Sequence, residues 1–324
     1  MRLALNRDRI AAARTRARRA ARRTAAIGYR SIVVPLLGHG ETEHALDLAC
    51  RLAARRGAKV LLVAPIVAPH ALPLDANFEP ETAELQQWLA HAEAIAKAHG
   101  VGTKTRLVRT RATALGRELA EVARDHRAEL VVVGAPVQSR RGFREAFPRE
   151  IRSILQDAPC RVLIVSGRAA RRGGEDEPAL HRILVPMKAG PIGEEMVATA
   201  VKLAEDAGAG LQALHVIKVP LDQHFEARLS TQEEQAAASL AEAVQLGERA
   251  GVPIAGESVR GRSIGEAIVL AAADFEADLI VLGSSPRWRR QSRFFSPTVD
   301  YVLRHAAAEV LVVAFPQGVF DDQV

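Results

Sequence analysis

The segment AELVVVG at residues 128–134 recurs as ADLIVLG at residues 277–283, 149 residues further along the chain. Each is a run of consecutive aliphatic residues that is too short for a helix and ends on glycine, which is typical of a strand buried on both faces of a sheet. Four other segments repeat in the same order at offsets of 148 to 151 residues. The sequence therefore predicts one domain fold that occurs twice.

The other repeats lie on either side of this pair. They are IVVP at 32–35 with ILVP at 183–186, GA and VLLV at 57–63 with GA and an apolar run at 208–216, TALGRE at 113–118 with RSIGEA at 262–267, and VLIV at 162–165 with VLVV at 310–313. Apolar runs alternate with stretches of helical period, and Cys50 falls on the apolar stripe of one such stretch. The alternation predicts βαβ units around a parallel sheet with helices on both faces, and it assigns Cys50 to the core.

Ten strands are expected, five in each copy. The predicted strands cover residues 31–36, 58–66, 103–109, 129–134 and 161–166 in the first copy, and 182–187, 210–217, 254–259, 278–283 and 309–314 in the second. At 324 residues the chain has room for two such domains, each long enough to bury its own core.

Composition divides the chain further. Residues 1–24 are mostly Arg and Ala, sixteen of the 24, which suits a basic tail and cannot form a core. The stretch 168–179 is rich in Gly, Arg and acidic residues without apolar period, which is typical of a linker. The domains predicted around them are residues 25–167 and residues 180–324.

The positive charge of the chain is concentrated in the tail. Residues 1–24 carry nine Arg and one Asp, a charge of +8, so the net charge of +6 leaves +6 − 8 = −2 for the rest. A nearly neutral body gives no basic surface that would follow a phosphate backbone. We therefore do not expect nucleic-acid binding by the folded part.

Several other classes of site are not predicted. The two cysteines, Cys50 and Cys160, have no metal-ligand spacing, the ten histidines form no H-E-x-x-H motif, and no G-x-S-x-G motif occurs. We therefore predict neither a metal site nor a catalytic one. With no apolar run of about 18 residues, we expect a cytoplasmic protein, or one held peripherally at the inner face of a membrane.

Particular strings carry a family resemblance. The Val-Pro that ends the first strand of each copy, ADLIVLG at 277–283, and VLRHA at 302–306 before VLVV resemble the universal stress protein family, as does ILQDAPCRVLIV at 154–165. The resemblance implies two tandem Rossmann-like domains, each with a five-stranded parallel sheet of order 3-2-1-4-5. It also implies a pseudo-dimer whose seam is formed by the last strands, residues 162–165 against 310–313, with a homodimer as the alternative.

Members of the family that bind ATP carry a G-x2-G-x9-G-[S/T] signature after the fourth strand and an Asp at the end of the first. The first copy keeps Gly134 but has Val137, Phe147-Pro148-Arg149 and, at the Asp position, Leu37. The second copy keeps Gly283 but has Pro286, Ser296-Pro297-Thr298 and, at the Asp position, Lys188. These departures argue against ATP binding of the usual kind in either copy.

The second copy retains more of the groups that a phosphate needs. The candidate nucleotide-binding residues are Lys188, Gly283, Ser284, Ser285, Ser296 and Thr298, and ATP or AMP would be the ligand. A structural interpretation competes with this one, in which Ser296 is the N-cap of a helix and Pro297 lies in its first turn.

The sequence thus favours a non-enzymatic stress-response or regulatory protein with degenerate nucleotide sites. Similar tandem domains form the soluble C-terminal regions of some amino-acid permeases, so an amino-acid permease or an anionic membrane surface, reached through the Arg-rich tail, is an expected partner. The alternative is a sensor that binds ATP or cyclic AMP in the second copy. The loop at 286–295, with four Arg and three aromatics, would either bind an anion, nucleic acid or partner, or cover the end of the core.

Overall fold

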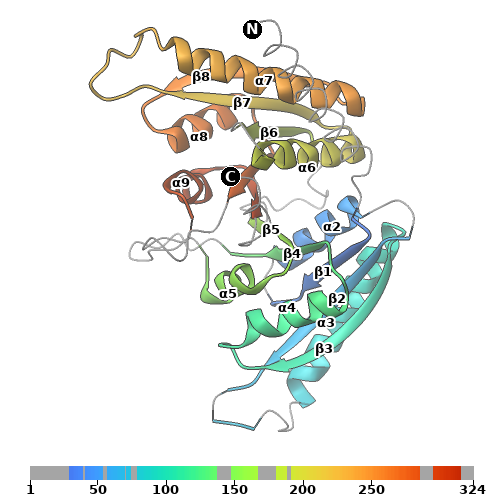
Figure 1. Ribbon diagram of the computed structural model, residues 1–324. Coiled ribbons are helices and arrows are strands. Elements are labelled where there is room, and N and C mark those ends of the chain that lie inside the picture. The colour runs from blue at the N-terminus through green and yellow to red at the C-terminus, as the bar shows by residue number, and fades with distance from the viewer. Residues whose placement is uncertain are drawn as a thin grey trace, which may run out of the picture.

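The computed structural model describes residues 29–38, 41–53, 57–69, 71–73, 79–136, 147–166, 180–187, 191–284 and 295–314. Figure 1 shows two α/β halves, the first coloured blue to green and the second yellow to red, which meet at the centre of the molecule. The predicted tail, the predicted linker, Lys188, Ser285 and residues 286–294 of the predicted loop lie outside the described residues.

The ten predicted strands are confirmed, with ends that differ by at most two residues from the prediction. The first half contains β1 (Ser31–Pro35), α2 (Glu41–Leu52), β2 (Lys59–Val67), α3 (Glu79–Ala98), β3 (Gly102–Thr110), α4 (Leu115–Asp125), β4 (Leu130–Gly134), α5 (Arg149–Asp157) and β5 (Arg161–Ser166). The second half contains β6 (Arg182–Pro186), α6 (Pro191–Ala207), β7 (Gly210–Lys218), α7 (Ser230–Ala250), β8 (Ile254–Gly261), α8 (Ile264–Asp274), β9 (Leu279–Ser284), α9 (Pro297–His305) and β10 (Glu309–Ala314).

The strands form one sheet of the order β3-β2-β1-β4-β5-β10-β9-β6-β7-β8. Each half keeps the expected order 3-2-1-4-5, and all pairs within a half are parallel. The prediction of two domains, each with a five-stranded parallel sheet, is confirmed, and the structure joins the two sheets into one of ten strands. The reason is that the last strand of each half hydrogen-bonds to the last strand of the other.

This junction, the seam, is antiparallel and lies where the family resemblance places it. The paired residues are Val162–Ser166 and Val310–Ala314, which contain the predicted segments 162–165 and 310–313, with Ile164 opposite Val312 and Val165 opposite Leu311. Apart from Ser166, they are almost wholly buried aliphatic side chains, so the seam removes apolar surface from water as well as pairing backbone groups. The halves therefore associate as a pseudo-dimer within one chain.

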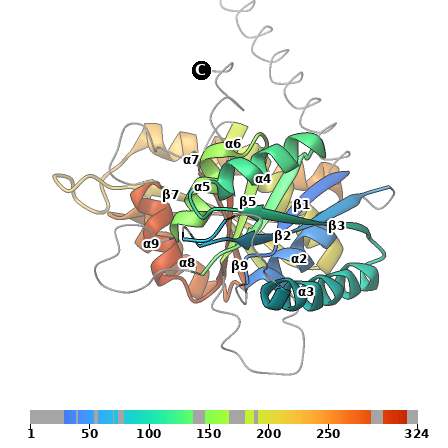
Figure 2. The same cartoon turned by 90° about the horizontal axis from the view of Figure 1, so that it is seen from below.

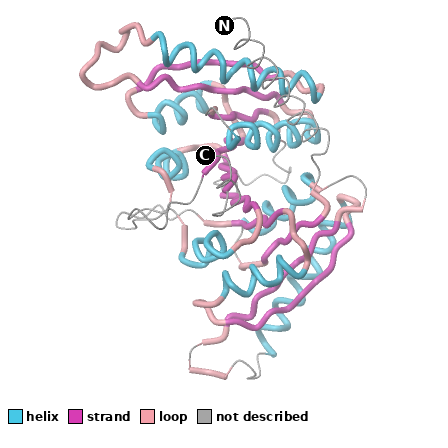
Figure 3. The backbone as a smooth tube through the Cα atoms, viewed as in Figure 1, coloured by secondary structure: helices cyan, strands magenta, loops and turns pink. Residues whose placement is uncertain are grey.

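Helices cover both faces of the sheet (Figure 2). On one face α2, α3, α6 and α7 pack over alternate strand residues such as Ile32 and Val34, and on the other α4, α5, α8 and α9 pack over residues such as Val33. Cys50 belongs to the first of these layers and is 5% exposed, which confirms its assignment to the core, and burial raises the pKa of its thiol to about 12. Each layer contains residues of both halves, so the core runs through the seam without interruption. The backbone tube in Figure 3 shows the same layering, with strands in the middle and helices on either side.

The ends of helices repeat between the halves as closely as the strands do. Gly100 after α3 and Gly251 after α7 have φ of 68° and 74°, the left-handed conformation that glycine adopts without steric cost. Arg127 after α4 and Glu276 after α8 adopt the same conformation, with φ of 51° and 52°, although neither is glycine. The duplicated fold thus preserves even its unusual backbone positions.

The outer edges of the sheet are β3 and β8. Most residues of both strands are exposed or half-buried, and they carry charged side chains, among them Lys104 and Arg106 on β3 and Glu257 and Arg260 on β8. Charged side chains on an edge strand oppose pairing with another strand.

Candidate functional site

The candidate sites lie where the strand order of each half reverses, between β1 and β4 and between β6 and β9. Ligands of open α/β sheets bind at the carboxyl ends of the strands at this switch point. Gly134 ends β4, and Gly283 and Ser284 end β9, so the first glycine of the family signature stands at the expected place in both halves.

The structure gives these glycines a packing role. A Cβ on Gly134 would lie 2.7 Å from the backbone nitrogen of Thr42 and closer still to the carbonyl group of Glu41, at the start of α2. A Cβ on Gly283 would lie within 3.0 Å of side-chain atoms of Ile192 and Met196, in the first turns of α6. Glycine at this position lets the helix after the first strand approach the fourth strand, whether or not a phosphate binds nearby.

The helix that follows the signature begins differently in the two halves. In the first half Pro148 is the N-cap of α5 and no side chain caps the helix. In the second half the Ser296 hydroxyl oxygen accepts the Val299 backbone N–H at 3.3 Å, and Pro297 is the first residue of α9. The interpretation of Ser296 as an N-cap followed by a first-turn proline is therefore confirmed.

The predicted nucleotide-binding residues fall into two groups within the second half. Gly283 and Ser284 end β9, where Ser284 is buried and lies opposite Ala314 of β10, while Ser296 and Thr298 begin α9. Lys188 and Ser285 lie outside the described part of the chain. Binding of a nucleotide by these residues stays a prediction.

Two phenylalanines meet at the positions that precede α5 and α9. Phe147 and Phe295 are 1% and 3% exposed, and their rings pack edge to face with centroids 5.6 Å apart and an interplanar angle of 78°. This geometry is the favoured one for aromatic pairs. Phe147 occupies the position of the third glycine in the family signature. ATP-binding members have a small residue there, whereas this chain has an aromatic ring that packs on Phe295 of the other half.

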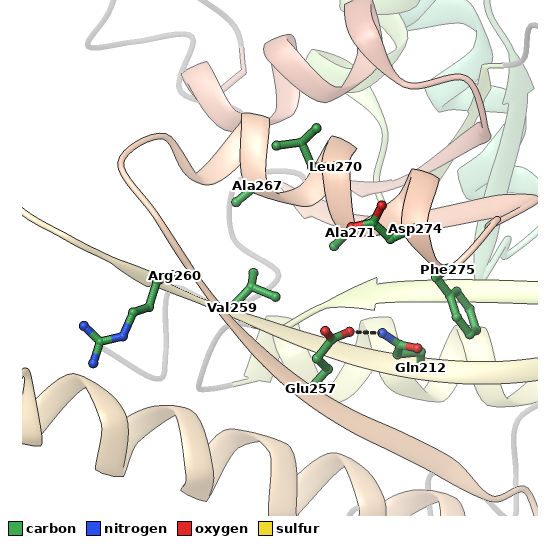
Figure 4. A pocket seen from close by; sticks show the side chains of 9 residues that line it. All are labelled: Gln212, Glu257, Val259, Arg260, Ala267, Leu270, Ala271, Asp274 and Phe275. Atoms are coloured by element: carbon green, nitrogen blue, oxygen red, sulfur yellow. Dashed lines mark hydrogen bonds between the residues drawn. The ribbon is translucent and has the colours of Figure 1, made fainter. Parts of the chain in front are cut away.

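A cavity of about 370 Å³ opens between α8 and the outer strands of the second half (Figure 4). Glu257 accepts a hydrogen bond from the side-chain amide of Gln212, and Asp274 and Phe275 project from the end of α8 across from them. In the first half the residue equivalent to Glu257 is Arg106, and it forms an ion pair with Asp125, the equivalent of Asp274, at 3.4 Å. The second half thus has two carboxylates, those of Glu257 and Asp274, at the positions of this ion pair, and Arg260 also lines the cavity.

Charged side chains cross the seam on the face covered by α2 and α6. The Arg161 guanidinium at the start of β5 donates to Glu195 of α6 at 3.0 Å and to the Tyr29 hydroxyl at 3.2 Å. His44 Nδ1 of α2 lies 3.5 Å from Oε1 of Glu309 at the start of β10. Burial raises the pKa of Tyr29, which keeps its phenol protonated. These ionic contacts join the halves in addition to the aliphatic strands.

The contacts of Arg161 with Glu195 and of His44 with Glu309 were not predicted from the sequence. His44 and Glu195 occupy equivalent places in the two copies, at an offset of 151 residues, and Arg161 and Glu309 do so at an offset of 148. A comparison of charges at equivalent positions next to the last strand would have been the signal.

The contact between His44 and Glu309 makes the seam sensitive to pH. The Glu309 carboxylate, with smaller contributions from Asp47 and Glu43, raises the pKa of His44 above its usual value of 6.5. A histidine whose pKa is raised by folding stabilises the folded state below pH 6.5, and this contribution is lost as the pH rises through the folded-state pKa. We expect the substitution His44→Gln to lower the free energy of unfolding by about 0.5 to 1 kcal/mol at about pH 5.5. At about pH 8.5 the loss should be much smaller.

Urea unfolding at both pH values measures this difference. The free energy of unfolding of the variant must be subtracted from that of wild type at each pH, because other histidines also change the stability with pH. Burial lowers the pKa values of His126 and His215, which gives a pH dependence of stability of opposite sign. Parallel pH profiles of wild type and variant would contradict the expectation.

The described ranges hold neither a candidate metal centre nor a candidate membrane span. No group of three or more His, Cys, Asp and Glu side chains within them is placed to hold a metal ion. No helix in those ranges is both long enough and apolar enough to cross a bilayer.

Fold and site together define a tandem, doubly wound α/β protein in which Gly134 and Gly283 stand at the switch points of the two halves. The chain belongs to the universal stress protein family, whose family model matches residues 28–166 and again residues 179–314. The family is a stress-response family. A search of curated protein sequences finds no match.

Solved structures show the same fold. A universal stress protein from Archaeoglobus fulgidus DSM 4304 has a TM-score of 0.57 at 14% identity, covering 88% of this chain and 96% of its own. A functionally unknown protein from Pseudomonas aeruginosa PAO1 has a TM-score of 0.55 at 15% identity, covering 90% and 94%. A universal stress protein from Archaeoglobus fulgidus in complex with dAMP matches over 42% of this chain and 98% of its own, with 17% identity and a TM-score of 0.34. At these identities the likeness concerns the fold.

Proposed function

We propose that this chain is a non-enzymatic regulatory protein of the stress response that acts through its surfaces, with its two nucleotide-type sites no longer binding phosphate in the usual way. The observation that carries the proposal is the aromatic pair of Phe147 and Phe295, which sits in the core just before the helices whose first turns would hold a phosphate.

The beginnings of those helices support the proposal. A phosphate at a helix start is held by backbone N–H groups and a hydroxyl. Proline has no N–H, and one stands at the start of each helix, Pro148 as the N-cap of α5 and Pro297 as the first residue of α9. The hydroxyl oxygen of Ser296 already accepts the Val299 N–H. Fewer donors therefore face a ligand at either helix than the family signature provides.

Isothermal titration calorimetry of the full chain with ATP, AMP and cyclic AMP tests the proposal. We expect no saturable heat up to a ligand concentration of about 500 μM, which corresponds to affinities weaker than about −4.5 kcal/mol. A saturable heat with one or two ligands per chain would contradict it.

An adenine-nucleotide sensor is the second candidate. It is supported by the hydroxyls of Ser284 at the end of β9 and of Ser296 and Thr298 at the start of α9, at the edge of the sheet where such ligands bind. This candidate predicts one ligand per chain in the same titration, and a heat that is lost in Lys188→Met, which removes a charge and keeps the side-chain length.

We further propose that the Arg-rich tail binds an anionic membrane surface and so holds the chain beside a transporter. This proposal rests on composition alone, nine Arg against one Asp in residues 1–24, which lie outside the described part. Co-sedimentation with phosphatidylserine vesicles is expected to be lost when residues 1–24 are deleted, and binding that survives the deletion would exclude this role of the tail.

A further inference from the structure

The two ion pairs across the seam are related by the internal symmetry of the chain, and their charges are reversed. Position 44 and its equivalent 195 hold His and Glu, and position 161 and its equivalent 309 hold Arg and Glu. One contact therefore joins a first-half helix to a second-half strand, His44 to Glu309 at 3.5 Å, and His44 is the cation of this pair when its imidazole is protonated. The other joins a first-half cation on a strand to a second-half anion on a helix, Arg161 to Glu195 at 3.0 Å.

We propose that this charge inversion makes each half selective for a half of the opposite type. If two first halves paired through the same surface, His44 would face Arg161 at both ends of the seam, cation against cation. If two second halves paired, Glu195 would face Glu309 at both ends, carboxylate against carboxylate. Only the pairing of a first half with a second half places opposite charges together at both ends. The partner that this surface fits is therefore the second half, supplied by the same chain or by another copy of it.

The backbone and the aliphatic core of the seam do not supply this selectivity. VLIV at 162–165 and VLVV at 310–313 have nearly the same side chains, and each strand could pair antiparallel with its own kind. Ile164 and Val312 are equivalent residues and lie directly opposite one another, so the pseudo-two-fold axis passes between them. In a pair of like halves, residue 164 would face 164, or residue 312 would face 312. Discrimination must therefore come from side chains at the margins of the strands.

The charges are placed where they are effective. Side-chain exposure is 27% for Arg161, 9% for Glu195, 30% for His44 and 16% for Glu309, so solvent screens the pairs less than it screens a surface contact. Glu309 Oε1 is buried without a hydrogen-bond partner in the described residues, which leaves His44 as the cation nearest to it in the structure. Placing a like charge against a buried charge is costly, because neither can recover its hydration.

A third ion pair between the halves is more peripheral. Arg51 of α2 lies 3.9 Å from Asp206 of α6, and these side chains are 20% and 36% exposed. The equivalent of Arg51 is Lys202, which would keep an attraction to Asp206 in a pair of second halves. The selectivity therefore depends on the two inner contacts.

Cysteines on the pseudo-axis provide a direct readout of pairing in the full chain. In a background with Cys50→Ala and Cys160→Ala, the changes Ile164→Cys and Val312→Cys place two thiols on facing residues of adjacent antiparallel strands, within the Cα separation that a disulfide bridges. After mild oxidation and proteolysis, mass spectrometry counts three linkages. The 164–312 link reports opposite halves, and the 164–164 and 312–312 links report like halves.

With native charges we expect 164–312 links to dominate. Because the tether between the halves also favours this link, the test compares charge variants at the same protein concentration. Arg161→Glu sets a new carboxylate against that of Glu195 in the native pairing, and it gives paired first halves a carboxylate facing His44 at both ends. We expect the ratio of 164–164 to 164–312 links to rise by at least about tenfold, which corresponds to about 1.4 kcal/mol. Adding Glu195→Arg restores opposite charges in the native pairing, so the ratio should fall below that of Arg161→Glu alone. It should stay above the native value, because the new carboxylate at position 161 still faces His44 in paired first halves.

Glu309→Arg tests the second contact independently. It sets a new guanidinium against His44, favours paired second halves, and should raise 312–312 links by a similar factor. For Arg161→Glu, the matched control is Arg106→Glu, which makes the same change of charge on β3 at the outer edge of the sheet. Circular dichroism identifies any variant that fails to fold, in which case the other contact carries the test. Link ratios that do not respond to either reversal, or an Arg161→Glu effect that Glu195→Arg does not reduce, would overturn the proposal.

Discussion

Phe147→Ala is expected to lower the free energy of unfolding by about 3 to 5 kcal/mol, as large-to-small changes of a buried aromatic residue do. The ring is 1% exposed and packs on Phe295 of the other half, so its removal leaves a cavity where the two halves share a core. Phe295→Ala should cost a similar amount for the same reason. Urea unfolding followed by circular dichroism measures both.

The double variant separates the aromatic contact from simple cavity formation. Edge-to-face pairs contribute about 0.5 to 1.5 kcal/mol beyond the area they bury, so the two single costs should exceed the cost of the double variant by about this amount. Strictly additive costs would show that each ring stabilises only its own half, without energetic coupling across the seam.

Gly134→Ala should be the most damaging single methyl addition at the two candidate sites. A Gly to Ala change at a compatible position stabilises by about 0.4 to 1 kcal/mol, because the unfolded chain loses freedom. Here the new methyl group meets the backbone of Glu41 and Thr42, which cannot rotate away. We expect a net loss of about 3 kcal/mol, at the upper end of the range for overpacked cores, measured by urea unfolding.

Gly283→Ala provides the matched comparison in the second half. The atoms in its way are the side-chain ends of Ile192 and Met196, and these can change rotamer. Its cost should be only about 1 kcal/mol. Equal losses in the free energy of unfolding at the two positions would contradict the expectation that a methyl group against backbone atoms costs more than one against side-chain atoms.

The fold could be predicted closely because its signals are local and repeated. The buried strands read as uninterrupted aliphatic runs such as LVVVG at 130–134, and their recurrence at almost constant offsets identified the duplication. The assignment of Cys50 to the core followed from helical spacing alone. Strand order and the seam at 162–165 came from the family resemblance, since periodicity does not say which strands are neighbours.

The sites were less predictable because they depend on contacts between distant residues. The sequence showed that Phe147 and Phe295 stood near the signature, but their contact joins residues 148 positions apart and depends on how the halves meet. Arg161 and Glu195 appear as ordinary surface charges until the antiparallel junction brings β5 beside α6. Ser296 was predictable from the Ser-Pro pair, because an N-cap is a local structure.

The charged outer strands have a consequence for the growth of assemblies. In each half the last strand is the one that pairs with the other half, and within the chain β5 and β10 pair with each other. The two rims left in the described sheet, β3 and β8, carry residues such as Arg106 and Glu257 that resist the docking of another strand. The charged edges therefore oppose extension of the described sheet beyond the ten strands of the two halves.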